Sequence, residues 1–328
     1  MRELQEIVGH LCRSEAGSVL ATLAAVNGSS YRRPGARMLV TEGRARIGSI
    51  SGGCLEEDLV ERSARVAASG RAELVVYDTT AENDVVWGVG LGCHGVVRIL
   101  LEPLPPRPSW ACTVDDNLRA GRATELAVVW ENPRGPLGTR LADPSTSGAP
   151  GVFRERIEAP TSLSIFGAGD DAQPLARMAL ELGWRVTVAD PRPAMLTEER
   201  FPAVLALVLG PADELVARAA PPPGSLAVVM THHYRHDVPL VGHLLPLPLA
   251  YLGLLGPKAR SERIMADLAA TGLCVTDDMR ARLRAPVGLD LGADAPEGVA
   301  LSIIAEMTAV HSGRNARPLR ERDRPIHA

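Results

Sequence analysis

No stretch of the sequence approaches the ~18 consecutive apolar residues that a membrane-spanning helix needs. The first residues, MRELQEIVGHLCRSEAG, lack the uninterrupted apolar core of a signal peptide. An excess of positive charge is also absent, because the net charge is -4 at pH 7, and this argues against a general nucleic-acid-binding surface. We therefore expect no membrane span and no nucleic-acid partner.

Cysteine is scarce, and its spacing excludes the usual structural metal sites. The five cysteines are odd in number and widely scattered, and no two of them form a C-x-x-C pair: Cys12, Cys54, Cys93, Cys112 and Cys274. This usage predicts a reduced, cytoplasmic protein.

The length of 328 residues is large for a single core and predicts two domains. We expect a mixed α/β domain over 1–145 and a second domain over 160–328. The segment ENPRGPLGTRLADPSTSGAPG (131–151) is rich in Pro, Gly and Ser, which indicates a loop or linker, and we place the junction near 140–160. In the first domain the patterns predict helices over 1–14 and from Cys54 to Gly70, and strands over 18–26, 36–41, 44–49, 73–78, 96–104 and 124–131. PPRPSW (105–110) is interpreted as a break between them.

From residue 161 onward, short apolar runs alternate with helical patterns, as in LSIFGAG, AQPLARMALELG and WRVTVADPR. This alternation predicts βαβ units and a doubly wound parallel sheet, that is, a Rossmann-like domain. The last helix is expected to begin at Asp294, with Glu297 as its capping-box partner.

A glycine loop follows the first strand of this second domain. Gly167 and Gly169 open a helix in the pattern G-x-G-x-x-A, and Asp190 ends the next strand about 20 residues on. Gly167 would form the tight turn, Gly169 would let the backbone approach a phosphate, and Asp190 would bind a ribose diol. Asp170 and Asp171 would repel that phosphate, so two interpretations stay open: a nucleotide or dinucleotide site, or a degenerate site that takes another ligand.

The segment THHYRHD (231–237) places three histidines and an aspartate after a predicted strand. A metal site is one interpretation of His232, His233, His236 and Asp237. We favour the other, in which they are loop histidines at the carboxyl edge of the sheet, with His232 beside the ligand crevice.

Two cysteines lie in glycine-rich surroundings. Cys54 follows Gly52 and Gly53 at the start of a predicted helix, where backbone amides lower a thiol pKa and favour a nucleophilic thiolate. Cys93 lies in the run GLGCHG, which also leaves its thiol uncrowded. A small packed cysteine is the alternative for both positions.

Arginines are concentrated in the loop SSYRRPGARM. Arg32, Arg33 and Arg37 present guanidinium groups that suit a phosphate or a polar heterocycle, although such a run is often only a solvated loop.

Together these motifs resemble the xanthine dehydrogenase accessory factor family (XdhC/CoxI). GSSYRRPGARMLV, GSISGGCLEEDL and GLGCHGVVRILLEPL are similar to its N-terminal domain, and SIFGAGDDAQPLARMALELGWRVTVADPR with VMTHHYRHD is similar to its Rossmann domain. The resemblance covers nearly the whole chain, in the family's order.

The resemblance implies a chaperone that binds molybdenum cofactor of the molybdopterin type, assists its sulfuration and inserts it into a xanthine dehydrogenase-type molybdenum hydroxylase. It also implies a cysteine desulfurase as sulfur donor, a phosphate contact at the three arginines and a sulfur role for Cys54 or Cys93. Classical enzymatic turnover is not expected, and a homodimer is the default assembly. The alternatives are an NAD(P)-dependent oxidoreductase that uses the Rossmann domain, and a non-catalytic scaffold for a molybdenum enzyme.

Overall fold

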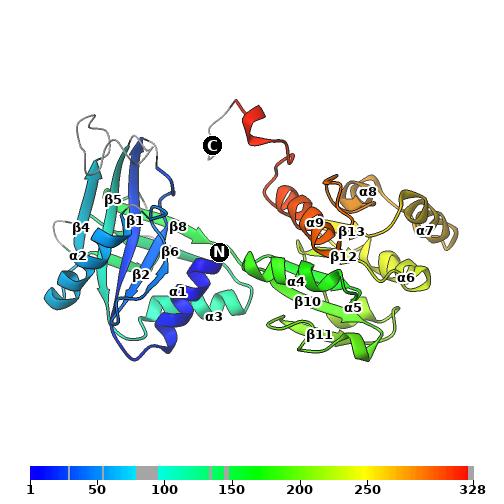
Figure 1. Cartoon of the computed structure of the whole chain (residues 1–328), viewed down its shortest axis with the longest axis horizontal. Helices are drawn as coiled ribbons and strands as arrows, with labels where there is room; N and C mark the ends of the chain where they lie inside the picture. The colour runs from blue at the N-terminus through cyan, green and yellow to red at the C-terminus, as the bar shows by residue number, and fades with distance from the viewer. Residues whose placement is uncertain (29, 54, 79–94, 133–134, 144–147, 324–328) are drawn as a thin grey trace. The chain divides into compact units, whose positions relative to one another are not determined.

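The computed structural model describes residues 1–28, 30–53, 55–78, 95–132, 135–143 and 148–323. The chain divides into two compact units, Met1–Pro160 and Thr161–Ala328 (Figure 1). Their folds confirm the expected class, a mixed α/β unit followed by a Rossmann-like parallel sheet. Among the helices described, none is long and apolar enough to cross a membrane.

The first unit is built on a five-stranded antiparallel sheet with the order β3-β2-β1-β5-β4. Its strands confirm the predicted ones, with small shifts at their ends: β1 (Ser18–Gly28), β2 (Arg37–Thr41), β3 (Arg46–Gly48), β4 (Glu73–Asp78) and β5 (Gly95–Leu104).

Helices cover both faces of this sheet, which explains why β1 is a continuous apolar run. Val19, Ala21 and Leu23 pack in the cluster that includes α2 (Glu56–Ser69), whereas Leu20 packs with α1 (Arg2–Arg13) and α3 (Ser109–Arg119). Side chains alternate between the faces because successive residues of a strand point in opposite directions. Gly70 ends α2 in the left-handed conformation, with φ 64°.

The segment between residues 105 and 160 contains more structure than the sequence predicted. A second, three-stranded sheet has the order β7-β6-β8, formed by β6 (Thr124–Val129), β7 (Gly138–Leu141) and β8 (Val152–Ile157). Only β6 was expected. The break predicted over 105–110 overlaps the start of α3, and the rest of this helix was not predicted. Pro108 in fact precedes α3 as its N-cap, and Trp110, Val114 and Leu118 give the helix a buried face.

The second unit is a six-stranded parallel sheet with the order β11-β10-β9-β12-β13-β14, which is the Rossmann order. Its strands are β9 (Ser162–Phe166), β10 (Arg185–Asp190), β11 (Ala206–Leu209), β12 (Leu226–Val229), β13 (Tyr251–Leu254) and β14 (Leu283–Arg284).

Helices lie on both faces, so the sheet is doubly wound (Figure 1). Val228 packs with α4 (Ala172–Glu181) and α9 (Pro296–His311), while Ala227 and Val229 pack with α5 (Leu215–Ala219), α6 (Tyr234–Leu244) and α7 (Lys258–Ala270). A short helix, α8 (Asp277–Arg282), leads into β14. The prediction of Asp294 as an N-cap is wrong: Ala295 caps α9 without a side-chain bond, because Pro296 takes the first helical position that proline favours.

Candidate functional site

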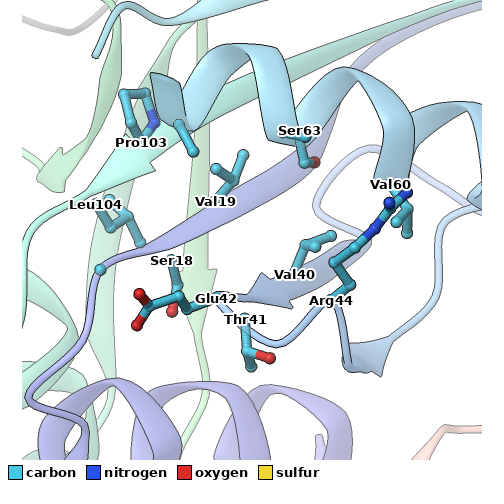
Figure 2. A pocket seen from close by; sticks show the side chains of 13 residues that line it. Ser18, Val19, Val40, Thr41, Glu42, Arg44, Val60, Ser63, Pro103 and Leu104 are labelled. Atoms are coloured by element: carbon cyan, nitrogen blue, oxygen red, sulfur yellow. The ribbon is translucent and has the colours of Figure 1, made fainter. Parts of the chain in front are cut away.

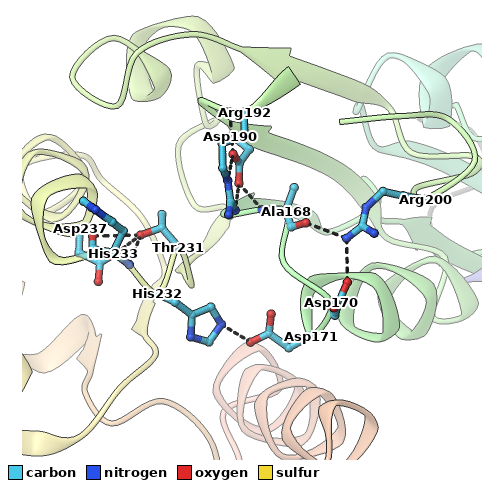
Figure 3. Close-up of polar contacts among 10 residues, drawn as sticks. All are labelled: Ala168, Asp170, Asp171, Asp190, Arg192, Arg200, Thr231, His232, His233 and Asp237. Carbon is cyan, nitrogen blue, oxygen red and sulfur yellow. Dashed lines mark hydrogen bonds and ion pairs between the residues drawn. The ribbon is translucent and has the colours of Figure 1, made fainter. Parts of the chain in front are cut away.

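The crevice of the second unit lies where the strand order reverses, between β9 and β12. In open parallel sheets, ligands bind at this point, outside the carboxyl ends of the strands. The Gly167 loop follows β9, Asp190 ends β10, and Thr231 and His232 follow β12, so the sequence-predicted residues of this unit do meet there (Figure 3).

Asp190 is fully buried, and its carboxylate is surrounded by donors of the chain itself. It accepts hydrogen bonds from the Ala168 N–H at 2.6 Å and from the Arg192 N–H at 2.8 Å, Nε at 2.9 Å and Nη2 at 2.8 Å. Burial opposes ionisation, but the hydrogen bonds from Arg192 and Ala168 outweigh it and lower the pKa of Asp190. Asp190 is therefore ionised, and the positive charge of Arg192 already balances its negative charge.

The two aspartates at the start of α4 also have partners. Asp170 forms an ion pair with Arg200 at 3.0 Å, and the same guanidinium donates to the Ala168 carbonyl at 3.1 Å. Asp171 lies 2.7 Å from Nε2 of His232, and its other oxygen, Oδ1, is buried without a hydrogen-bond partner among the described residues (Figure 3). A side chain at Gly169 would meet that Oδ1 at 2.8 Å, so glycine here leaves room for the Asp171 carboxylate.

His232 has a left-handed backbone, with φ 58°, which is costly for a residue other than glycine. Its side chain is 59% exposed, whereas that of its partner Asp171 is 12% exposed. A strained, exposed imidazole at the switch point of a Rossmann sheet is a candidate functional group.

The other histidines of the segment belong to α6. His233 is the N-cap residue of α6, and its ring lies 4.3 Å from that of His236. Asp237 is buried and accepts from Thr231 Oγ1 at 2.5 Å and from Arg260. Among the residues that the structure describes, no three His, Cys, Asp or Glu side chains are arranged to hold a metal ion.

In the first unit, the loop before Cys54 wraps around the carboxylate of Glu56. Its oxygens accept hydrogen bonds at 2.6–3.2 Å from the Ser51 hydroxyl and from five backbone N–H groups, those of Ile50, Ser51, Gly52, Gly53 and Leu55. Burial opposes ionisation of this buried group, but the bonds from Ser51 and the backbone prevail and lower the pKa of Glu56 to about 2. We call these donors and their carboxylate the Glu56 nest.

The Glu56 nest changes the expectation for the two glycines. Backbone amides beside Cys54 were expected to lower its thiol pKa, but the N–H groups of Gly52 and Gly53 both donate to Glu56. Gly52 and Gly53 nevertheless need to be glycine, because their φ angles are 83° and 130°.

The three predicted arginines have three different environments. Arg32 forms a two-bond ion pair with Glu3, at 2.5 and 3.1 Å. Arg37 is buried in β2 and pairs with Glu155 of β8, so its charge is neutralised inside the unit. Arg33 is exposed, and among the described residues its guanidinium has no ion-pair partner.

Tyr31 connects the arginine loop to the Glu56 nest. A Cβ atom added at Gly52 would lie 3.1 Å from Tyr31 Cε1 and 3.5 Å from Cζ, so the edge of the ring lies directly over this glycine. Tyr31 as a whole residue is nevertheless 65% exposed. The result is an exposed aromatic ring on a glycine loop, next in the chain to the two arginines Arg32 and Arg33.

Cys54 and Cys93 lie outside the described residues. The three described cysteines are unpaired, and Cys274 is exposed. Burial, followed by a hydrogen bond with Cys112, raises the pKa of the Cys12 thiol to about 12. Cys12 is therefore a neutral packing residue at pH 7.

A cavity of about 350 Å³ also lies in the first unit, beside α2 (Figure 2). Val19, Val40, Val60 and Ser63 form its inner wall, and Glu42 and Arg44 lie at its edge (Figure 2). It shares none of the predicted site residues.

Sequence reasoning missed the partners that neutralise the predicted site residues. The sequence patterns did not single out Glu56, Arg192, Arg200 or Arg260. The D-P-R run at 190–192 carried a signal, because an arginine two residues after a strand-end aspartate can fold back onto it.

Comparisons with known proteins agree with this architecture. Residues 11–78 match the XdhC and CoxI family, and residues 163–307 match the XdhC Rossmann domain. A Bacillus subtilis (strain 168) protein, which carries the name of a probable xanthine dehydrogenase subunit, is 32% identical, over 94% of this chain and 97% of its own length.

Two further similar proteins extend over most of the chain. The Escherichia coli (strain K12) protein named molybdenum cofactor insertion chaperone PaoD is 23% identical, over 90% of this chain and 84% of its own length. A crystal structure described as a xanthine dehydrogenase from Bacillus halodurans has a TM-score of 0.82 and 29% identity, and covers 97% of this chain and 99% of that one.

Proposed function

Because the chain belongs to the XdhC and CoxI family, we propose that it is an accessory protein that binds molybdenum cofactor and inserts it into a xanthine dehydrogenase-type molybdenum hydroxylase. The observation that carries this proposal is the likeness, along 90% of the chain, to a protein named as a molybdenum cofactor insertion chaperone. The Bacillus subtilis relative, which is named for xanthine dehydrogenase, supports the class of client. The cofactor is cargo in this proposal, so classical turnover is not required.

The first unit offers groups that suit the cargo. A molybdopterin combines a flat heterocycle with a phosphate, which call for a stacking surface and a cation. The exposed Tyr31 ring supplies the surface, and Arg33, whose guanidinium has no ion-pair partner among the described residues, supplies the cation nearby in the chain. Arg32 and Arg37 are held by Glu3 and Glu155, so we assign the phosphate contact to Arg33.

The sulfur chemistry belongs to the two glycine-flanked cysteines in this proposal. The Glu56 nest holds the residues on both sides of Cys54, since Gly53 and Leu55 both donate to Glu56. We propose that Cys54 or Cys93 assists sulfuration of the cofactor, with a cysteine desulfurase as sulfur donor, in a cytoplasmic homodimer.

The test is anaerobic binding of molybdenum cofactor, with molybdenum and pterin quantified on the purified protein. Wild type is compared with Cys54→Ala, Cys93→Ala and Arg33→Ala, and Cys274→Ala is the matched control because Cys274 is an exposed cysteine of the other unit. We expect binding by wild type and the control, and loss with Arg33→Ala and at least one of the other cysteine variants. Failure of wild type to bind overturns the proposal. If both Cys54→Ala and Cys93→Ala bind as much cofactor as wild type, the result favours a non-catalytic scaffold.

No observation favours an NAD(P)-dependent oxidoreductase. The residues predicted for the nucleotide site lie at the crevice: Gly167, Gly169, Asp190 and His232. The Asp190 carboxylate and His232 Nε2 are, however, bonded to other side chains of the protein. Nucleotide binding is therefore a question separate from the proposed function.

A further inference from the structure

The crevice of the Rossmann unit has the outline of a dinucleotide site, but side chains of the same chain occupy it. In dinucleotide-binding Rossmann domains, the acid at the end of the second strand binds a ribose diol, and the glycine loop holds the pyrophosphate at a helix N-terminus. Asp190 and the Gly167 loop stand at these two positions.

The ribose position is closed by Arg192. Its guanidinium donates to both oxygens of Asp190, and the backbone N–H groups of Ala168 and Arg192 also donate to this carboxylate. Since Asp190 has no exposed surface, a ribose diol reaches it only if the Arg192 pair first breaks. Asp190 would then accept hydrogen bonds from two neutral ribose hydroxyls in place of its two-bond ion pair with Arg192. The exchange is unfavourable in free energy, because charge-assisted hydrogen bonds are stronger than neutral ones.

The pyrophosphate position is closed by carboxylates. Asp171 occupies the space beside Gly169 that a side chain there would need. A Cβ atom added at Gly169 would lie only 2.8 Å from Asp171 Oδ1. His232 holds the other oxygen at 2.7 Å, and Arg200 holds Asp170 at 3.0 Å (Figure 3). The N-terminus of α4 corresponds to the helix end that binds an anion in other Rossmann domains. Here the carboxylates of Asp170 and Asp171 supply the negative charge at that position.

We propose that this unit carries a self-filled nucleotide site, in which Arg192 takes the place of the ribose and the Asp170 and Asp171 carboxylates take the place of the pyrophosphate. The unit keeps the Rossmann architecture but does not bind a dinucleotide. Besides the exposed Asp170 and Arg192 side chains, the crevice presents to solvent the His232 imidazole, which is bonded to Asp171. This inference does not depend on the proposed cofactor role.

The test measures binding of NADH, NADPH and ADP-ribose to the full chain, by nucleotide fluorescence and by calorimetry. The opened variant combines Asp170→Asn, Asp171→Asn and Arg192→Ser; the amide at 171 can still hydrogen-bond His232. The control combines Glu214→Gln with Arg218→Ser, which removes an exposed ion pair of the same unit. Melting curves verify that each variant is folded, and Arg192→Ser alone replaces the triple variant if the latter is not.

We expect wild type and control to show dissociation constants weaker than about 1 mM for all three probes. Removal of the two carboxylates and the arginine is expected to tighten ADP-ribose binding by about tenfold or more, because two like charges near the phosphates are lost and Asp190 becomes accessible. Saturation of wild type by any probe below about 100 µM overturns the inference. A folded opened variant that binds no better than the control also overturns it, because these side chains would then not be what closes the site.

Discussion

Replacement of Glu56 should destabilise the first unit, and the structure gives the magnitude of the expected loss in folding free energy. In Glu56→Gln, the side-chain amide places an NH2 group where a carboxylate oxygen now accepts three hydrogen bonds. If the NH2 replaces Oε1, the N–H groups of Ile50, Ser51 and Gly52 lose this acceptor. If it replaces Oε2, the Gly53 N–H loses it, while the Leu55 N–H keeps Ser51 Oγ as an acceptor. The pKa of Glu56 falls from 4.5 to about 2 on folding, despite burial, because Ser51 and the backbone hydrogen-bond its charged form. That shift corresponds to about 3 kcal/mol of folding free energy at pH 7.

The pH dependence has a definite sign. A carboxylate whose pKa is lowered by folding stabilises the protein above its unfolded pKa, and this contribution disappears as the pH falls through the folded pKa. We therefore expect Glu56→Gln to destabilise the first unit by about 3 kcal/mol at pH 7 and by about 2 kcal/mol at pH 3.5, with the difference vanishing near pH 2.

The assay is urea unfolding followed by pulsed hydrogen exchange and mass spectrometry, so that peptides of Met1–Pro160 are read separately from those of Thr161–Ala328. Glu57→Gln is the matched control, because Glu57 is an exposed neighbour in the same helix, and it should change stability by less than about 0.5 kcal/mol. If Glu56→Gln matches the control at pH 7, or if its deficit does not shrink on acidification, the nest is not what holds this loop.

Three more predictions concern the same two units. Arg37→Ala should destabilise the first unit by about 3–5 kcal/mol, because it leaves Glu155 without its buried partner, whereas Arg33→Ala should change the unfolding free energy by less than about 0.5 kcal/mol. Gly52→Ala should cost about 1–2 kcal/mol and displace Tyr31, because φ there is 83° and the new Cβ lies 3.1 Å from the ring; Gly43→Ala, with open space at its Cβ, is the control. Tyr31→Ala should weaken cofactor binding about tenfold while Tyr31→Phe stays near wild type, since stacking depends on the ring and not on the hydroxyl.

Each of these predictions has a contradicting outcome. Urea midpoints that do not distinguish Arg37→Ala from Arg33→Ala would mean that the Arg37–Glu155 pair is dispensable. Equal losses for Gly52→Ala and Gly43→Ala would remove the case for the Tyr31 contact. A Tyr31→Phe variant as impaired in cofactor binding as Tyr31→Ala would exclude stacking as the role of the ring.

The local patterns of the sequence predicted the secondary structure that depends on them. The alternating apolar runs after residue 161 specified the parallel Rossmann sheet, because a strand buried on both faces by helices needs apolar residues at every position. Gly70 marked the end of α2, because a left-handed residue at that position favours glycine. The motifs also placed Gly167, Asp190 and His232 at one edge of the sheet, since the carboxyl ends of parallel strands meet there.

The pairing of charges, by contrast, was decided only by the tertiary structure. Arg37 pairs with Glu155 from 118 positions along the chain, and Asp171 pairs with His232 from 61 positions away. A guanidinium or carboxylate in a motif looks free until the fold brings its partner, because ion pairing depends on distance in space and not along the chain. The sequence thus determined which residues stand at the two candidate sites. The fold determined that Arg37 and Asp190 have their charges neutralised within the protein, whereas Arg33 has no such partner among the described residues.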